Sequence, residues 1–252
     1  MMNGVTLDGA LDNPGAPLTF LEISPTTAHT ATVILLHSLG DTGQGFEDIA
    51  REFRNDPDLQ HIKWILPHAN FIPITANAGL HSRAWYDVMS FDCDDEQDTT
   101  SMLRNAHLLN NLISTELEAT NIPSTRMVLG GFSQGAVETF VAGVYCNHRL
   151  AGFASLSGFF PMPNELKSLA SQAFWDAPFF IGHGLNDRLI PVDHCDITLE
   201  LLTSLGAMRS TNDWSRGITF IVYEDGRHDC PTEELDDLSR WLKAVVPSRL
   251  SS

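Results

Sequence analysis

The chain has 252 residues, and 15 lysine and arginine residues against 32 aspartate and glutamate residues give it a formal charge of −17. Apolar residues make up 43% of it and charged residues 19%, a composition typical of a folded globular protein and not of a disordered one. The acidic excess argues against a general nucleic-acid-binding protein and against adsorption to anionic lipid, because both depend on clustered lysine and arginine side chains.

The first half of the chain alternates apolar runs with amphipathic segments. The run at 31–37 is continuously apolar, which is typical of a strand buried on both faces of a sheet. Residues 68–99 are rich in Asn, Pro, Gly and Asp and are predicted to be irregular. Strands are predicted in this half at 17–24, 31–37 and 62–67, and helices at 43–54 and 100–119.

The second half continues the same alternation. Strands are predicted at 126–132, 150–156, 178–183 and 218–223, and helices at 134–146, at 195–208 and from about 231 onwards. Strands that alternate with helices predict βαβ units and a mostly parallel sheet with helices on both faces. No internal repeat or long linker interrupts the pattern, which favours a single α/β domain over residues 1–252 with a flexible segment at 1–16. In such folds functional residues gather at the carboxyl ends of the strands.

The N-terminal sequence and the cysteines predict a cytoplasmic protein. The first residues lack the basic region and apolar run of a secretory signal, and the longest apolar runs are far shorter than the roughly 20 residues of a membrane-spanning helix. The four cysteines are widely spaced, form no CxxC pair and are expected to be reduced thiols; they are Cys93, Cys146, Cys195 and Cys230.

A candidate nucleophile follows one of the predicted strands. The sequence GFSQG at 131–135 matches the pattern G-x-S-x-G, directly between an apolar strand and a helix. The pattern forms a sharp turn in which side chains at the glycine positions would collide with neighbouring backbone. Ser133 is therefore predicted to be a nucleophile held at a helix N-terminus, where N–H groups favour negative charge. The alternative is a tight packing turn without chemistry.

A base is needed to remove the serine proton, and in hydrolases with this turn it is a histidine that follows both the serine and an acid in the chain. His228 fits this order, because it lies on the loop after strand 218–223. His148 and His183 also follow Ser133 but leave no room for an intervening acid at a strand end, and His194 begins a helix too soon after the candidate acid.

The acid is predicted to be Asp187, on the loop after strand 178–183. Its carboxylate would accept the Nδ1–H of His228, fix the imidazole tautomer and stabilise the imidazolium. Asp193 competes for this role but is expected to be the N-cap of the next helix. Asp176 precedes the strand and belongs to the wrong end of the sheet.

An oxyanion formed during acyl transfer needs two backbone donors. One is predicted to be the N–H of Gln134, the residue after the nucleophile. The other is predicted to be the N–H of Leu39, on the loop 37–43 that follows an earlier strand. The same loop contains Asp41-Thr42-Gly43, which also predicts a helix N-terminus.

Seven sequence blocks occur in order along the chain: LLHSLGDTG (35–43), LPHA (66–69), WYD (85–87), GGFSQGA (130–136), SLSGFFP (155–161), HGLNDRLIP (183–191) and GRHDC (226–230). With these blocks the chain, from about 33 to 242, resembles the small α/β-hydrolases that include acyl-protein thioesterases, lysophospholipases and carboxylesterases. The resemblance implies an α/β-hydrolase fold and a cytosolic serine hydrolase that cleaves acyl esters or thioesters without a cofactor. It implies the same triad and oxyanion hole, with acylated proteins, lysophospholipids or small esters as substrates. Two alternatives are a hydrolase or lactonase for a small metabolite and a non-catalytic binding protein of the same fold.

The chain departs from the family pattern in three places. Ser38 stands where the family usually has glycine, Tyr86 stands where it has phenylalanine, and the segments 91–100 and 209–217 extend beyond a minimal member. Because the segment 91–100 follows the WYD block, substrate preference is the property most exposed to these changes.

Substrate contacts are predicted from apolar residues near the WYD block. Ile74, Leu80 and Trp85 are candidates to line an acyl groove, with ordinary packing under a long loop as the alternative. No metal site is predicted, because the acidic residues at 92–96 lack the glycine and the glutamate of a calcium loop. Two acidic clusters, at 92–98 and at 233–237, are expected to rim the cleft and to disfavour anionic substrates.

Overall fold

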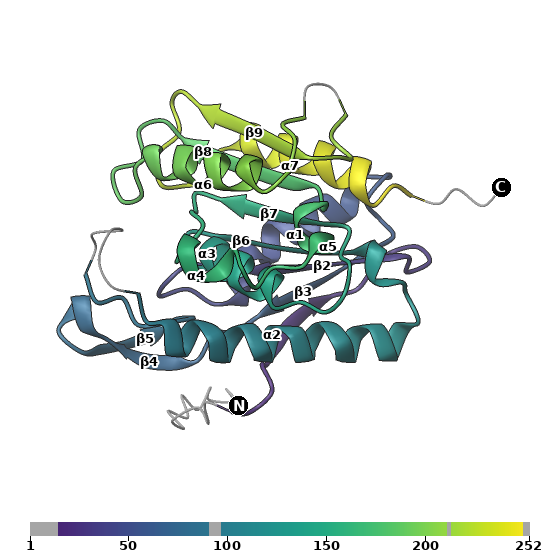
Figure 1. The fold of residues 1–252 in the computed structure, drawn as a ribbon. Helices are drawn as coiled ribbons and strands as arrows, with labels where there is room; N and C mark the ends of the chain where they lie inside the picture. The colour runs from purple at the N-terminus through teal and green to yellow at the C-terminus, as the bar shows by residue number, and fades with distance from the viewer. Residues whose placement is uncertain (1–14, 91–96, 211–212, 249–252) are drawn as a thin grey trace, which may run out of the picture.

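The computed structural model describes residues 15–90, 97–210 and 213–248. Its centre is a seven-stranded sheet in which one edge strand is antiparallel and the other strands are parallel (Figure 1). In spatial order the strands are β1 (Phe20–Ile23), β3 (Ile62–Pro67), β2 (Ala31–Leu36), β6 (Met127–Phe132), β7 (Gly152–Leu156), β8 (Phe179–Gly184) and β9 (Ile218–Tyr223). The antiparallel edge strand is β1, which pairs with β3.

Helices cover both faces of the sheet and divide the apolar core in two. One half packs α2 (Thr99–Thr120), α3 (Gln134–Val144) and α6 (Asp193–Ser204) with the short α4 (Pro163–Leu166) and α5 (Gln172–Trp175) against one face. The other half packs α1 (Glu47–Asn55) and α7 (Thr232–Val245) against the opposite face. The predicted mostly parallel sheet with helices on both faces is confirmed.

A β-hairpin lies within the stretch predicted to be irregular. Strands β4 (Phe71–Ile74) and β5 (Leu80–Arg83) form a separate two-stranded ribbon, so the prediction of irregular structure across 68–99 was wrong there. The ribbon is half exposed and carries Pro73 in its first strand, so it lacks the apolar pattern that identifies a buried strand. In Figure 1 the hairpin lies at the end toward which β7, β8 and β9 point.

Two predicted helix starts differ in detail. The helix predicted from residue 43 begins as a 3₁₀ turn at Gly43–Phe46, whose N-cap Thr42 accepts a hydrogen bond from the Gln44 N–H. Asp193 is the first residue of α6 and not its N-cap, a position that Val192 occupies without a side-chain hydrogen bond.

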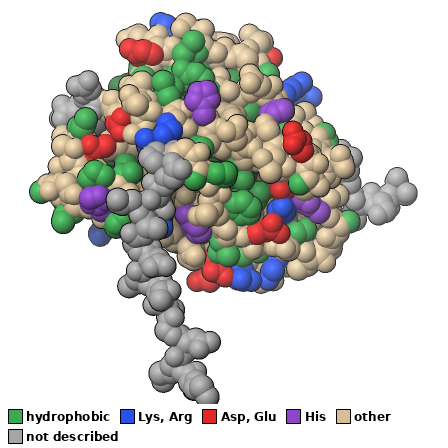
Figure 2. All heavy atoms as spheres, turned by 90° about the horizontal axis from the view of Figure 1, so that it is seen from below, with side chains coloured by type: hydrophobic (Ala, Val, Ile, Leu, Met, Phe, Trp, Pro, Cys, Tyr) green, Lys and Arg blue, Asp and Glu red, His purple; other side chains and the backbone are tan. Residues whose placement is uncertain are grey.

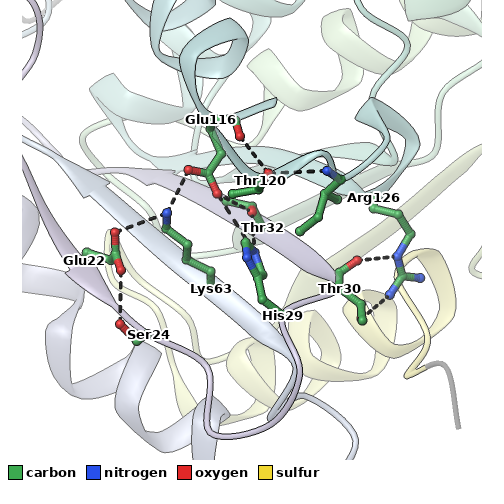
Figure 3. A network of polar contacts seen from close by, with 10 residues as sticks. Glu22, Ser24, His29, Thr30, Thr32, Lys63, Glu116, Thr120 and Arg126 are labelled. Atoms are coloured by element: carbon green, nitrogen blue, oxygen red, sulfur yellow. Dashed lines mark hydrogen bonds and ion pairs between the residues drawn. The ribbon is translucent and has the colours of Figure 1, made fainter. Parts of the chain in front are cut away.

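A polar network joins α2 to the amino end of the parallel strands (Figure 3). Glu116 of α2 accepts a hydrogen bond from the Thr32 hydroxyl at 2.9 Å and one from Lys63 Nζ at 2.8 Å. Lys63 also lies 3.2 Å from the carboxylate of Glu22 on β1. Burial opposes the charge on Lys63, but the two carboxylates outweigh it and raise its pKa. The network therefore fixes three strands and the longest helix at the end opposite the carboxyl ends of the strands.

The surface on the α2 side, the apolarity of the helices and the state of the cysteines complete the description of the fold. Seen from the side of α2, acidic, basic and histidine side chains are interspersed with hydrophobic ones (Figure 2). No helix within the described ranges is long and apolar enough to cross a membrane. Among the described cysteines, Cys146, Cys195 and Cys230 are free thiols, whereas Cys93 and most of the predicted flexible segment lie outside the described residues.

Candidate active site

Ser133 lies in the turn between β6 and α3, with φ 55° and ψ −120°. A residue with a side chain in such a conformation is strained by on the order of 1–3 kcal/mol, and the surrounding structure has to enforce it. The flanking glycines make the turn possible. A Cβ on Gly131 would lie 2.4 Å from the main chain of Gly135, and one on Gly135 would lie 2.3 Å from the carbonyl oxygen of Leu36.

Three side chains from separate loops form a continuous hydrogen-bonded line. His228 Nε2 lies 2.7 Å from Ser133 Oγ, and His228 Nδ1 lies 2.7 Å from Asp187 Oδ2. A carboxylate only accepts hydrogen bonds, so Nδ1 carries the proton and Nε2 presents its lone pair to the serine hydroxyl. The ring of Phe132 packs against the imidazole with 5.0 Å between ring centroids. The structure thus brings together the serine, histidine and aspartate that the sequence singled out.

Main-chain contacts hold the loop of Asp187 against the loop of His228. The Leu185 N–H donates to the Tyr223 carbonyl and the Asn186 N–H donates to the Gly226 carbonyl, each at 2.9 Å. Gly184 permits this approach, because a Cβ there would lie 2.4 Å from the carbonyl oxygen of Arg227. The close fit of β8 and β9 at their carboxyl ends therefore places the aspartate and the histidine within reach of each other.

Asp187 is ionised despite its burial. Burial acts to raise the pKa of its carboxyl, but the hydrogen bonds from His228 and from the N–H groups of Leu189 and Ile190 outweigh it, and the pKa lies below its ordinary value. The two N–H groups donate to Oδ1 at 2.8 and 2.9 Å, which leaves Oδ2 for the histidine. A charged, fixed carboxylate is the state that stabilises an imidazolium.

The buried ring of His37 fixes the peptide that follows it. His37 Nε2 accepts a hydrogen bond from the Ala69 N–H at 3.0 Å, so Nδ1 carries the proton and donates to the Ser38 carbonyl at 2.7 Å. In a trans peptide the C=O and the N–H point to opposite sides, so the Leu39 N–H is directed away from His37. Ser38 takes part in this contact through its main-chain carbonyl and not through its side chain.

Leu39 and Gln134 border the same cavity as Ser133. Gln134 is the first residue of α3, where N–H groups have no partner within the helix. Two main-chain donors beside a nucleophile are the elements of an oxyanion hole.

Acid is expected to destabilise the fold through His37. Burial lowers the pKa of its imidazole from 6.5 to about 4, against the hydrogen bond to Ser38, which acts to raise it. Between these values the unfolded chain binds a proton on this residue that the folded chain does not, so stability falls as the pH falls from 6.5 toward 4. From pH 7 to pH 5 the contribution to the free energy of unfolding is a loss of about 2 kcal/mol.

Urea unfolding of the wild type at pH 7 and pH 5 measures this loss. The variant His37→Phe is less stable at both values but loses less stability between them, because it has no imidazole to protonate. The matched control is His107→Phe at an exposed position on α2, which is expected to keep the wild-type dependence. Equal pH dependence in the wild type and His37→Phe would contradict this account.

The side chain of Gln134 holds the WYD block in place. Its Oε1 accepts from the Trp85 N–H at 3.0 Å and its Nε2 donates to the Tyr86 carbonyl at 2.8 Å. The indole N–H of Trp85 donates to the His37 carbonyl at 2.8 Å, and Asn105 Nδ2 donates to the Trp85 carbonyl. The block therefore connects the turn at Ser133 with the loop 37–43.

The cavity beside Ser133 differs from the acyl groove expected from the sequence. Trp85 and Ile74 are fully buried, and Leu80 is 71% exposed on the hairpin, so none of the three borders the cavity and their assignment to it is corrected. Leu39, Ser133 and Gln134 border it as expected from the sequence, but its other lining residues were not predicted, because they come from separate segments that only the fold brings together. The lining is Leu39, Tyr86, Val88, Ser90, Gln97, Ser133, Gln134, Phe159, Leu189 and Ile190.

A larger cavity of about 680 Å³ lies at the opposite end of the sheet. It includes Arg149, Asp176 and Arg216 and the main chain around Gly217, at the amino ends of β7, β8 and β9. Its described lining contains no histidine to activate a nucleophile, so the smaller cavity beside Ser133 is the better candidate site. The described residues of the segment 209–217 lie at this far end, because the main chains of Ser210 and Met208 hydrogen-bond Ile218 at the start of β9.

The acidic clusters at 92–98 and 233–237 do not consist only of exposed carboxylates at the rim of the cleft, as the sequence had suggested. Glu234 is fully buried, and burial, with the nearby Asp229 and Asp237, raises its pKa to about 8. Asp98 is the N-cap of α2 and also accepts the Asp87 N–H, while residues 92–96 lie outside the described residues. Within the described ranges no group of three or more His, Cys, Asp or Glu side chains is placed to hold a metal ion.

Comparison with known proteins places this site in a family. Residues 20–246 match the model of the Phospholipase/Carboxylesterase family. Acyl-protein thioesterase 1 of Schizosaccharomyces pombe is 36% identical over 233 residues, which cover 92% of this chain and 99% of that protein. The chain belongs to the phospholipase/carboxylesterase family. Acyl-protein thioesterase 1 of Yarrowia lipolytica is 33% identical over 91% of this chain and 98% of its own length.

Solved structures agree with this assignment. Zea mays acyl-protein thioesterase 2 superposes with a TM-score of 0.76 at 28% identity, over 90% of this chain and 99% of that one. Arabidopsis thaliana SOBER1 superposes with a TM-score of 0.77 at 26% identity, over 86% and 99% of the two chains. The predicted α/β-hydrolase fold and the predicted enzyme class are confirmed: this member of the phospholipase/carboxylesterase family is a hydrolase of acyl esters or thioesters.

Proposed function

We propose that the protein hydrolyses acyl thioesters or esters through an acyl-enzyme on Ser133, with acylated proteins as its substrate class. The observation that carries the proposal is the line of two 2.7 Å contacts from Asp187 through His228 to Ser133, next to a cavity with an apolar lining. The thioesterases among its relatives, aligned over nearly the whole chain, support the choice of acylated proteins.

The first half of the reaction transfers the acyl group to the serine. His228 Nε2 takes the proton of Ser133 Oγ as this oxygen bonds to the acyl carbon, and Asp187 stabilises the imidazolium. The N–H groups of Leu39 and Gln134 stabilise the oxyanion of the tetrahedral intermediate. When the intermediate collapses, His228 returns its proton to the leaving thiolate or alkoxide.

The second half releases the acid. His228 takes a proton from water, whose oxygen attacks the acyl carbon of the acyl-enzyme, and a second oxyanion occupies the same two N–H groups. Collapse of this intermediate breaks the bond to Ser133 Oγ, which regains its proton from His228. Every step uses only water and groups of this chain, so the proposal includes no cofactor.

Activity on acyl chains of increasing length is expected to reveal an apolar acyl site. Each methylene that enters the cavity adds about 0.8 kcal/mol of binding, a factor of about four in kcat/KM, until the cavity is full. The measurement uses peptides that carry one S-acyl cysteine or one O-acyl serine, each with acyl chains from two to sixteen carbons. We expect kcat/KM to rise with chain length in both series and to be higher for the thioesters.

Two variants test whether the dependence of kcat/KM on acyl chain length arises in this cavity. Val88→Trp enlarges a lining side chain and is expected to shorten the preferred acyl chain, whereas Leu80→Ser, on the exposed hairpin, leaves the preference unchanged. A profile independent of chain length, with faster hydrolysis of a small lactone, would favour the alternative of a metabolite-specific hydrolase.

Charge and location remain predictions from the sequence. The exposed carboxylates Glu233 and Asp236 at the start of α7 support a preference for neutral or basic acylated peptides over anionic ones. A cytoplasmic location agrees with free thiols at the described cysteines.

A further inference from the structure

A second histidine lies directly behind the acid of the proposed triad. His183, near the carboxyl end of β8, is fully buried. Its Nε2 lies 2.8 Å from the carbonyl oxygen of Ile190 and 3.5 Å from Asp187 Oδ2, and its Nδ1 lies 3.0 Å from Cys195 Sγ.

The contacts of His183 permit one arrangement of protons. A carbonyl oxygen only accepts, so Nε2 carries the ring proton and donates it to Ile190. Nδ1 is then an acceptor, and the Cys195 thiol donates to it. Burial lowers the pKa of His183 and raises the pKa of Cys195 to about 12, so both groups are neutral.

This hydrogen bond fixes the turn that holds the acid. The N–H groups of Leu189 and Ile190 donate to Asp187 Oδ1, and the carbonyl of the same Ile190 is the acceptor for His183. His183 Nε2 also lies 3.5 Å from Asp187 Oδ2, the oxygen that contacts His228 Nδ1 at 2.7 Å. Hydrogen bonds thus hold the 187–190 turn at Asp187 and at Ile190. The Leu189 and Ile190 side chains of this turn border the cavity beside Ser133.

We propose that His183 is a positioning residue for the reaction: it holds the 187–190 turn, and through that turn it orients Asp187 toward His228. This inference rests on the proposed function, because His183 takes part in no chemical step itself and acts only through Asp187 and His228. Its role is to keep the Asp187 carboxylate aligned with His228 while the imidazole of His228 gains and loses a proton during the reaction.

Several other titratable groups surround His183. Asp187 and His228 face it from the site, and Cys195 and His194 face it from α6. Asp196 of α6 and the buried Glu234 of α7 also act electrostatically on Cys195. A pH profile of activity therefore reports on His183 only by comparison between variants that leave these groups in place.

Three substitutions at one position, with a matched control elsewhere, test the proposal. His183→Leu removes the donor, His183→Gln keeps an N–H at about the place of Nε2, and His183→Asn has an amide too short to reach Ile190. The control is His61→Leu, which removes another buried histidine that contacts a main-chain carbonyl, that of Val246 at 3.0 Å, in the other half of the core. For each variant kcat, KM, the pH profile of kcat/KM and Tm are measured with one acyl thioester.

We expect His183→Leu and His183→Asn to lower kcat at least about tenfold with little change in KM, because the imidazolium loses its aligned carboxylate. The acidic limb of their kcat/KM profiles should move to lower pH, and His183→Gln should recover most of kcat. His61→Leu should lower Tm alone.

The proposal is overturned if His183→Leu lowers Tm as His61→Leu does but keeps the wild-type kcat and pH profile. If His183→Leu does not fold, the Gln and Asn variants decide the matter, and equal kcat in these two also overturns it. Failure of the proposed function looks different, since wild-type hydrolysis would then persist in Ser133→Ala.

Discussion

Replacing Ser133 with alanine should abolish hydrolysis of acyl thioesters and esters. The proposed reaction has no other nucleophile, and the groups that remain, the base and the oxyanion donors, accelerate attack by water only weakly. In serine hydrolases the loss of the nucleophile lowers kcat by roughly 10⁴–10⁶-fold, and we expect a loss in this range. The same variant should no longer be labelled by a fluorophosphonate, which reacts with an activated serine.

Ser157→Ala is the matched control. Ser157 is fully buried, follows the neighbouring strand β7 and also has a positive φ, of 50°. Alanine there imposes the same backbone conformation without touching the line from Asp187 to Ser133. Turnover and labelling should survive in Ser157→Ala and disappear in Ser133→Ala, with a similar Tm in both. Turnover by folded Ser133→Ala at the wild-type rate would contradict the proposal of an acyl-enzyme on Ser133.

The parts of the site that could be predicted from sequence are those with a local constraint. The turn at Ser133 requires small residues at fixed positions on both sides, so the pattern is visible in five consecutive letters. Asp187 and His228 each follow a buried strand, and the parallel order of β8 and β9 brings the two strand ends side by side. Strand order along the chain therefore carried enough information to select both residues.

The parts that could not be predicted depend on packing between distant segments. Trp85 and Glu234 have the residue types of a substrate wall and an acidic rim, yet both are buried and face the interior. Nothing local distinguishes them from exposed neighbours such as Leu80 and Glu233. The cavity lining and the contacts of His183 with Ile190 and Asp187 arise only when separate segments of the chain meet.

The formal charge of −17 overstates the charge of the folded chain. Burial raises the pKa of Glu138 well above its ordinary value, and burial with the nearby Asp229 and Asp237 raises the pKa of Glu234 to about 8, so the Glu234 carboxyl is mainly protonated at pH 7. Both belong to helices that pack near the site, α3 and α7, where an ionised carboxylate without a partner would be costly. The acidic excess that bears on substrate choice is therefore the exposed part alone.

Replacing His37 with phenylalanine should lower kcat by roughly 10²–10³-fold, the cost of one oxyanion donor. His37 does not touch the acyl group in the proposed reaction; it holds the Ser38 carbonyl and so keeps the Leu39 N–H turned away from itself. Without the imidazole this peptide is free to rotate, and a rotated peptide would present an oxygen to the oxyanion. Fluorophosphonate labelling of Ser133 should continue at a reduced rate, because Ser133 and His228 remain in place.

His37→Asn separates orientation from packing. Its side-chain amide places an N–H near the position of Nδ1, so it can donate to Ser38, but like phenylalanine it leaves the Ala69 N–H without the Nε2 acceptor. Both variants should therefore lose stability, by about 1–3 kcal/mol for the unpaired N–H, whereas only phenylalanine should lose most of kcat. If the two variants lose kcat equally, the peptide is held by the rest of the loop and His37 serves stability alone. If His37→Asn keeps most of kcat and His37→Phe loses it, the orientation of the Leu39 N–H depends on the hydrogen bond from His37 to the Ser38 carbonyl, which belongs to the same peptide.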